Sequence, residues 1–247
     1  MRNFSVKAVC RTAALIGALM VGAAPVLGVP LVANGSFENT TATTTSTWWC
    51  PSLCTVANWS TLDYGQLIVL PSWYTNGYLV QVPLVGVAGA LPQSSPDGGN
   101  FIFSDSDYHN SAITQTITGL QPGRDYMVSF YQSLIQDTEL FVTIPGPVSG
   151  EWQVTFGTTT LNSAFMTGDG STLSFYNWKP QSMKFKATSP TQVLSFLAVG
   201  TGDPPLAGLD GVKVVPEPDS GILLLMGLLG FGAVYRFTHW QRIGRQG

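Results

Sequence analysis

Polar and apolar residues alternate with a period of two through the middle of this chain, and this period constrains the fold more than any other feature. Within 112–118, Ile113, Gln115 and Ile117 fall on one side and three threonines on the other. Successive residues of a strand point to opposite faces of a sheet, whereas one face of a helix repeats about every 3.6 residues. No stretch between residues 30 and 215 sustains the helical period. The pattern therefore predicts an all-β fold.

Strand signatures occur at further places along the chain. They are 126–131, 138–144, 152–156, 182–187 and 193–199. Gly, Pro, Asn and Asp separate them, as is typical of short strands joined by turns. Before the first of them, Gln121-Pro122-Gly123 predicts a tight turn, because Pro suits its second position and Gly its third, where φ is positive. We expect these strands to pack as a two-sheet sandwich.

The N-terminus has the form of a secretory signal peptide over 1–28. Arg2, Lys7 and Arg11 make a basic start, and 12–27 is almost wholly apolar or small. Signal peptides combine these two elements with a cleavage site of small residues. Cleavage after Gly28 would leave 30–215 as a single exported domain.

The C-terminal segment 216–247 combines three unlike elements. Pro216-Glu217-Pro218 comes first, an apolar run over 221–235 follows, and a basic end carries Arg236, Arg242 and Arg245. A helix over about 219–237 would measure roughly 28 Å against a hydrocarbon core of about 30 Å. Basic residues at both ends of the chain place both termini in the cytoplasm by the positive-inside rule.

This order of elements resembles the PEP-CTERM sorting signal of exported bacterial proteins. The resemblance implies that an exosortase, a membrane protease-transpeptidase, recognises the tail at the inner membrane and removes it. The protein would then reach the cell surface or the extracellular matrix. An ordinary single-span tail anchor is the alternative, but it leaves Pro216-Glu217-Pro218 unexplained.

The charge of the body differs from that of its ends. Residues 30–215 hold five basic and twelve acidic residues, a net charge of −7, while the whole chain has −3. Such a body offers no basic stripe to phosphates, so nucleic acid is not expected as a partner. It suits divalent cations or neutral ligands.

Two cysteines, Cys50 and Cys54, lie in the exported part, where disulfides persist. Residues four apart on a strand are roughly 13 Å apart, too far for a disulfide, so a turn at Pro51 must close the loop. A metal site would need more ligands than this segment offers. A redox pair normally has two intervening residues, whereas this one has three. We expect a disulfide.

Three further motifs occur in a fixed order. The chain opens its body with Leu31-Val-Ala-Asn-Gly-Ser-Phe-Glu38, places Gly-Leu-Gln-Pro-Gly inside 113–130, and closes with Gly208-Leu-Asp-Gly-Val-Lys-Val214. Together they resemble the first strand, the paired middle strands and the last strand of galactose-binding-like jelly rolls, a fold of carbohydrate-binding modules. Gly211 departs from the family, which commonly has Asp or Asn there. The resemblance implies a jelly-roll sandwich with Trp59 in its core.

The same resemblance implies a structural calcium ion. In this fold the Glu of the first motif and the Asp of the last often hold it with several backbone carbonyls, which places the ligands here at Glu38 and Asp210. Calcium takes six to eight oxygens, so the two carboxylates would serve only if carbonyls complete the shell. Alternatively, Glu38 ends a strand at the surface and Asp210 starts a turn.

Aromatic rings are the expected contacts for sugar, because they stack on the apolar faces of pyranose rings. Trp48 and Trp49 are the preferred candidates, since two adjacent rings on a strand face opposite sides and one of them can be exposed. The other candidates are Trp73, Tyr74, Tyr78, Trp152 and Trp178.

Three functions remain open from the sequence. The first is a non-catalytic module that binds extracellular polysaccharide, and the second is a structural matrix or adhesion protein with no specific sugar site. The third is a glycosidase, for which the sequence gives little support because it has no Gly-x-Ser-x-Gly motif and only His109 in the body. Exposed paired aromatics in a groove would favour the first, a flat polar surface the second, and two facing carboxyls the third.

Overall fold

The computed structural model describes eight segments of the chain. They are 30–41, 56–62, 66–69, 95–106, 111–136, 147–168, 176–202 and 205–217. The signal peptide, the Cys50–Cys54 pair, Trp48, Trp49, the strand predicted at 138–144 and the sorting signal from Pro218 onward lie outside these residues. Within the described segments, no helix is long and apolar enough to cross a membrane.

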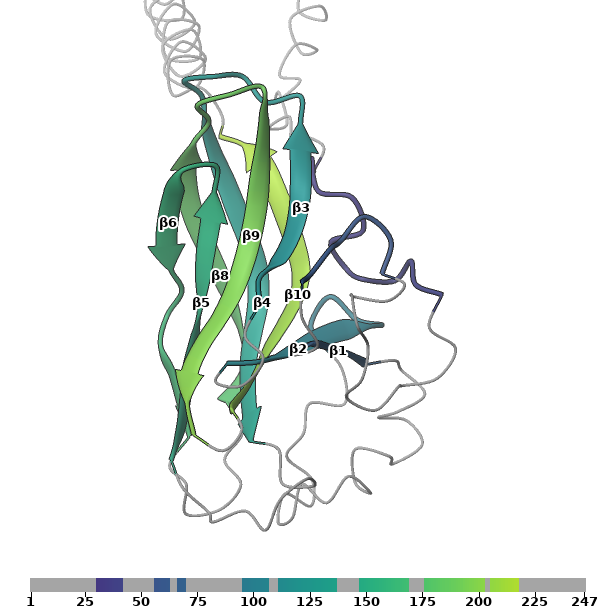
Figure 1. Cartoon of the computed structure of the whole chain (residues 1–247), viewed down its shortest axis with the longest axis vertical. Helices are drawn as coiled ribbons and strands as arrows, with labels where there is room; N and C mark the ends of the chain where they lie inside the picture. The colour runs from purple at the N-terminus through teal and green to yellow at the C-terminus, as the bar shows by residue number, and fades with distance from the viewer. Residues whose placement is uncertain are drawn as a thin grey trace, which may run out of the picture. The chain divides into compact units, whose positions relative to one another are not determined.

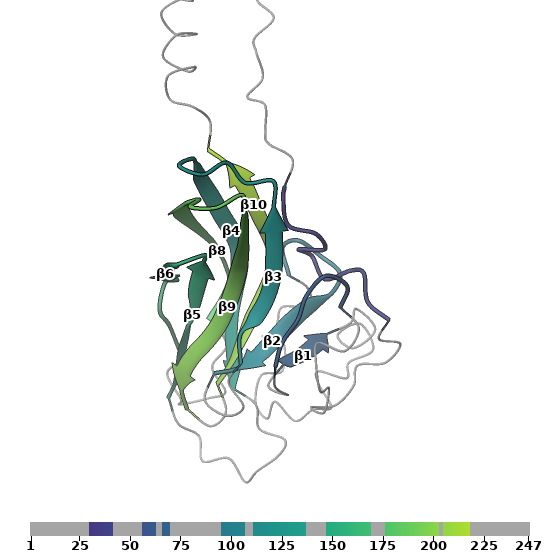
Figure 2. The same ribbon diagram turned by 45° about the horizontal axis from the view of Figure 1, so that its top comes forward.

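The described strands form two antiparallel sheets, which face each other in Figures 1 and 2. The first sheet has the order β1 (Gln66–Val69), β2 (Phe101–Asp105), β10 (Pro205–Pro216), β4 (Asp125–Gln136) and β8 (Tyr176–Lys186). The second has the order β3 (Ile113–Thr118), β9 (Thr191–Thr201), β5 (Val148–Phe156) and β6 (Thr159–Asn162), with β7 (Met166–Gly168) also paired to β5. The predicted all-β, two-sheet sandwich is confirmed.

The period-two pattern predicts the inner faces correctly. Ile113 and Ile117 are fully buried and Gln115 nearly so, while the intervening threonines face outward. β5 alternates buried and half-buried residues along its whole length. Trp59 is also in the core, as expected, and its ring lies 5.4 Å from that of Phe37. Burial of these apolar side chains between the sheets is the main stabilising contribution to such a fold.

The predicted turn between β3 and β4 is confirmed. The amide of Arg124 donates to the carbonyl of Gln121 at 3.1 Å, and Gly123 has a φ of 86°. These features place Pro122 and Gly123 at the two central positions of a type II turn. The turn carries the chain from β3 in the second sheet to β4 in the first sheet.

The opening motif forms an irregular segment instead of the strand implied by the resemblance. Asn34 and Phe37 have φ values of 54° and 56°, which break an extended conformation. The segment nevertheless follows β10: Leu31 donates to the carbonyl of Val214, and the amide of Val212 donates to that of Gly35, both at 2.9 Å. The first and last motifs are therefore neighbours in space.

Candidate functional site

The loop 95–100 connects the opening motif to β10. The amide of Asn100 donates to the carboxylate of Glu38 at 2.6 Å, and the side-chain amide of Asn100 donates to the carbonyl of Phe37 at 3.1 Å. On the other side, Lys213 of β10 pairs with Asp97 at 3.3 Å. Glu38 and Asp97 are thus held close to the middle of β10, where Asp210 lies.

Asp210 is fully buried in β10, opposite Tyr131 of β4. The alternative that Asp210 starts a turn is therefore wrong, because Asp210 is buried inside β10 and pairs with β4. Burial raises the pKa of Asp210 from its ordinary 3.8 to about 8, and the nearby charges of Asp97 and Glu38 add to the shift. A buried carboxylate resists ionisation because it loses its hydration.

Among the described residues, the Asp210 carboxylate also has no hydrogen-bond partner of ordinary geometry. The Ser95 hydroxyl and the Gly211 amide are nevertheless near enough to oppose part of the pKa shift. Nearly all buried polar groups in proteins are satisfied, so an unpartnered carboxylate requires a proton or a cation from outside the chain.

The carboxylates near Asp210 have the ligand type of a hard cation such as calcium, but not the converging geometry of a cation site. Glu38, Asp97 and Asp210 provide carboxylate oxygens, and such oxygens are what calcium prefers. The three do not converge into a metal-binding group by themselves, since the described residues contain no cluster of three His, Cys, Asp or Glu side chains with that geometry. Carbonyl oxygens would have to complete the shell, as the sequence also required.

Gly211 occupies its position for a conformational reason. It has a φ of 60°, and the register of β10 against β4 shifts between Asp210 and Lys213. A side chain at Gly211 would start 3.2 Å from atoms of Asp97 and 3.0 Å from the ring of Tyr131. Asp and Asn also tolerate positive φ. Gly at this position therefore allows the same backbone conformation without a side chain beside Asp97.

A charge-free groove runs along the edge strand β3. It has a volume of about 500 Å³ and is open to solvent on one side. Its lining consists mainly of hydroxyl, amide and backbone groups, together with the edge of Trp59: Leu31, Ala33, Asn58, Trp59, Ser60, Thr114, Gln115, Thr116 and Thr118. Gln115 joins two lining segments of the groove. Its side-chain oxygen accepts from Ala33 N and its side-chain nitrogen donates to Ala33 O, both at 2.8 Å. No pattern in the sequence indicated this groove.

The three tryptophans within the described segments are buried. Trp152 and Trp59 donate to the carbonyls of Gly208 and Asn34 at 3.0 and 2.9 Å, and both belong to the core. Trp178 packs edge-on against Phe101 and is 7% exposed. The proposal of Trp152 and Trp178 as open stacking platforms is therefore wrong, because their ring faces pack against protein.

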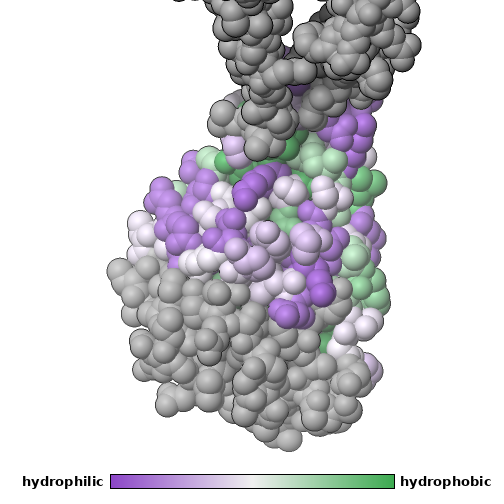
Figure 3. Space-filling model, turned by 180° about the vertical axis from the view of Figure 1, so that it is seen from behind, coloured by the Kyte–Doolittle hydropathy of each residue, from purple (hydrophilic) through white to green (hydrophobic). Residues whose placement is uncertain are grey.

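The outer face of the second sheet is almost uncharged. Its exposed and half-buried side chains are mostly Thr, Ser and Gln, with Val193 and Val199 as exposed aliphatic residues. Glu151 is the one charged residue among the outward positions of β3, β9, β5 and β6 that the structure describes, and it accepts from Asn162 at 2.7 Å. Seen from behind the view of Figure 1, the described surface mixes hydrophilic and hydrophobic residues (Figure 3).

Comparison with known proteins gives only distant likenesses. No protein-family model matches the chain, and no curated protein matches it significantly. Among solved structures, the carbohydrate-binding module TmCBM61 in complex with β-1,4-galactotriose is 12% identical, with a TM-score of 0.43 over 76% of this chain and 99% of its own. The CBM22-1 xylan-binding domain of Paenibacillus barcinonensis Xyn10C is 10% identical, with a TM-score of 0.38 over 77% and 96%.

A third likeness is to a cleaved adhesin domain of Lys-gingipain from Porphyromonas gingivalis. It is 14% identical, with a TM-score of 0.39 over 75% of this chain and 96% of that one. Similarities at this level are too low to transfer a ligand or a site residue to this chain.

Proposed function

We propose that this chain is an exported, exosortase-sorted surface or matrix protein whose body binds extracellular polysaccharide without catalysis. The signal peptide over 1–28 and the Pro216-Glu217-Pro218 tail support the sorting and the location outside the inner membrane. The sandwich between them supports a binding module. Its expected partners are the exosortase, briefly, and a neutral polysaccharide.

The observation that carries the sugar-binding proposal is the charge-free groove at β3. Sugar hydroxyls both donate and accept hydrogen bonds, and the groove offers Thr and Ser hydroxyls together with the Asn58 amide. A site without charge favours a neutral saccharide over an ionic ligand, because a charged group would lose hydration there without gaining a partner. The volume of about 500 Å³ suits a short stretch of a sugar chain.

Calcium has a structural role in this proposal. Glu38 and Asp210 would hold the ion, with Asp97 beside them, and its charge would balance the buried Asp210 carboxylate. Its effect would be to join the opening segment, the loop 95–100 and β10. The opening segment also lines the groove through Leu31 and Ala33, so loss of the ion should loosen one wall of the groove.

Affinity electrophoresis of the exported protein in gels containing the producing strain's own polysaccharide tests the function. We expect retardation of the wild type and several-fold weaker binding by whichever of Trp48→Ala and Trp49→Ala removes the exposed ring, because that variant would lose a stacking contact of about 1 kcal/mol. Thr116→Val should also weaken binding, about two- to tenfold for one lost hydrogen bond. Thr159→Val, an exposed threonine on β6 away from the groove, is the matched control.

A structural matrix protein is the second candidate, and a specific observation favours it. The described tryptophans are buried, and the outer face of the second sheet is nearly neutral and rich in hydroxyl groups. Equal migration of the wild type and all these variants in gels with and without polysaccharide would make this the better assignment. A glycosidase would need carboxyls facing across a cleft, and the lining of the β3 groove contains none.

A further inference from the structure

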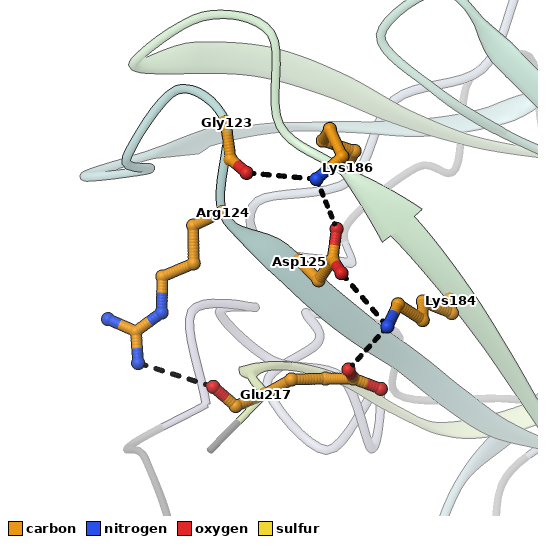
Figure 4. A network of polar contacts seen from close by, with 6 residues as sticks. All are labelled: Gly123, Arg124, Asp125, Lys184, Lys186 and Glu217. Carbon is orange, nitrogen blue, oxygen red and sulfur yellow. Dashed lines mark hydrogen bonds and ion pairs between the residues drawn. The ribbon is translucent and has the colours of Figure 1, made fainter. Parts of the chain in front are cut away.

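Glu217, in the middle of the Pro216-Glu217-Pro218 motif, is bound to the folded body through each of its polar groups (Figure 4). Its amide donates to the carbonyl of Asp125 at 3.0 Å. Its carbonyl accepts from a guanidinium nitrogen of Arg124 at 3.3 Å, and its carboxylate lies 2.8 Å from the amine of Lys184. The compact body accordingly extends from Gly28 to Glu217.

The residues around Glu217 form one connected network, which we call the Glu217 clamp: Arg124, Asp125, Lys184, Lys186 and Glu217. Lys184 bridges Glu217 and Asp125, which lie 2.8 and 2.9 Å from its amine. Lys186 lies 3.0 Å from the other oxygen of Asp125 and donates to the carbonyl of Gly123 at 3.1 Å. The pairing with Lys184 and Lys186 lowers the pKa of Asp125, and the carboxylates of Glu217 and Asp125 raise that of Lys184.

The charges of the Glu217 clamp do not balance in the uncut chain. The clamp contains three cationic side chains and only two carboxylates. The cations are Arg124, Lys184 and Lys186, and the carboxylates are those of Asp125 and Glu217. The surplus cation is Arg124, whose contact with Glu217 is to a neutral carbonyl. One additional negative charge at that carbonyl would balance the network and turn a neutral acceptor into a charged one, which makes a stronger hydrogen bond.

We propose that processing cuts the peptide bond between Glu217 and Pro218 and that the Glu217 clamp then holds the new C-terminus. This inference rests on the proposed sorting function and goes beyond it, because it names the bond and the residues that receive the product. In the hydrolytic form, water adds its oxygen to the carbonyl carbon of Glu217 and the bond to the nitrogen of Pro218 breaks. Glu217 then ends in a carboxylate, and the nitrogen of Pro218 takes both protons of the water and leaves as a secondary ammonium group.

The position of the cut follows from what the body can retain. Pro216 pairs with Tyr126 as the last residue of β10, so a cut before Glu217 would remove the residue to which both Arg124 and Lys184 bind. A cut after Glu217 keeps all three contacts. The α-carboxylate then forms on the atom that Arg124 already contacts, so the product needs no rearrangement to be held.

The test uses the full chain expressed in its exosortase-containing producer, followed by purification of the mature surface protein. Intact-mass analysis should give a C-terminus at Glu217. Carboxypeptidase digestion of this material should release Glu217 several-fold more slowly from the wild type than from Arg124→Gln or Lys184→Ala. Lys179→Ala, an exposed lysine on the same strand as Lys184, should behave as the wild type, and Lys184→Arg should restore much of the protection.

The outcomes separate this inference from the sorting proposal. A processed chain that ends at any residue other than Glu217 overturns the inference and leaves sorting intact. Equal release of Glu217 from the wild type, Arg124→Gln and Lys184→Ala shows that the clamp does not hold the terminus. A mature pool that still ends at Gly247 overturns both proposals.

Discussion

The Asp210 site lies in β10 and the Glu217 clamp lies just beyond the end of that strand, and the two accommodate carboxylates in opposite ways. Asp210 is fully buried without a hydrogen-bond partner, and its pKa rises to about 8. In the clamp, the side chains of Asp125 and Glu217 are 28% and 27% exposed, and each faces a lysine. A carboxylate charge is therefore destabilising at Asp210 and compensated by lysine in the Glu217 clamp.

This difference indicates which site depends on something outside the chain. A buried carboxylate without a partner must take up a proton or a cation, because desolvation of the free charge is costly. An exposed ion pair needs nothing further, and it contributes little to stability because solvent screens it. The Asp210 site should thus respond to pH and calcium, and the clamp should respond mainly to cleavage of the chain.

The largest expected effect is the pH dependence of the Asp210 site in a chelator. The pKa of Asp210 is raised on folding from 3.8 to about 8, so the folded state holds a proton that the unfolded chain releases. This stabilisation is complete below the unfolded pKa and is lost as the pH rises through the folded value. The free energy of unfolding should fall by up to about 1.4 kcal/mol per pH unit in that window.

Denaturant titrations between pH 4 and pH 9 would measure this slope, with Asp210→Asn as the reference. The difference between wild type and variant should grow in favour of the variant as pH rises. Parallel curves for the two proteins would show that Asp210 does not take up a proton on folding.

Calcium should instead stabilise the folded protein through the same site, because it would bind the ionised Asp210 carboxylate. A ligand that binds only the folded state stabilises it by about 2.7 kcal/mol at a concentration one hundred times its Kd. We expect the melting temperature to rise in millimolar calcium for the wild type and to be unchanged for Glu38→Gln and Asp210→Asn. Glu151→Gln, on the second sheet, should keep the wild-type response. A wild-type melting curve that is identical in chelator and in calcium would contradict a cation site.

A smaller effect is expected at Gly211, which shapes the backbone beside Asp210. Its φ of 60° disfavours residues with a side chain, and a Cβ would approach Asp97 and Tyr131. Gly211→Ala should cost about 1–2 kcal/mol, and Gly211→Asn should cost less strain because Asn tolerates this conformation. Urea unfolding would measure both. Equal costs for the two variants would show that crowding against Asp97, instead of the backbone, decides the residue.

The smallest effect on stability is expected from the Glu217 clamp. Lys184→Ala should lower the melting temperature only slightly at neutral pH, because the Lys184 side chain is 54% exposed. The pKa of Asp125 is lowered on folding, so its contribution is present above its ordinary 3.8 and lost as the pH falls through the folded value. The difference in melting temperature between wild type and Lys184→Ala should accordingly vanish in acid. A large difference that persists there would assign Lys184 a packing role.

Local patterns predicted the strands well because each depends on a few adjacent residues. The alternation at Ile113–Ile117 identified β3 and its buried face, and Pro122-Gly123 identified the turn. The resemblance to jelly rolls implied a strand for the opening motif, whereas Asn34 and Phe37 adopt positive φ. Asn is known to visit that region, but nothing in the local sequence indicates it for Phe37, which is fully buried and in contact with Trp59.

The candidate sites were predicted only in part. Glu38 and Asp210 were named through motifs, but their closeness to Asp97 depends on the loop 95–100, which lies far from both in the chain. The groove at β3 combines 31–33, 58–60 and 114–118, so no single segment contains its signal. Trp152 and Trp178 could not be told from exposed tryptophans, because a ring suits both a core and a binding face.

Residue spacing and composition were sufficient to predict the fold class, the inner face of each well-patterned strand, the turn before β4 and the acidic balance of the body. These properties follow from residue spacing, backbone preference and charge, which are local or additive. Only the tertiary structure decided that Asp210 is buried without a partner, that an uncharged groove forms beside β3, and that Glu217 is held by Arg124 and Lys184. Burial and pairing depend on segments that are remote in sequence, and their positions are set by the packing of the two sheets.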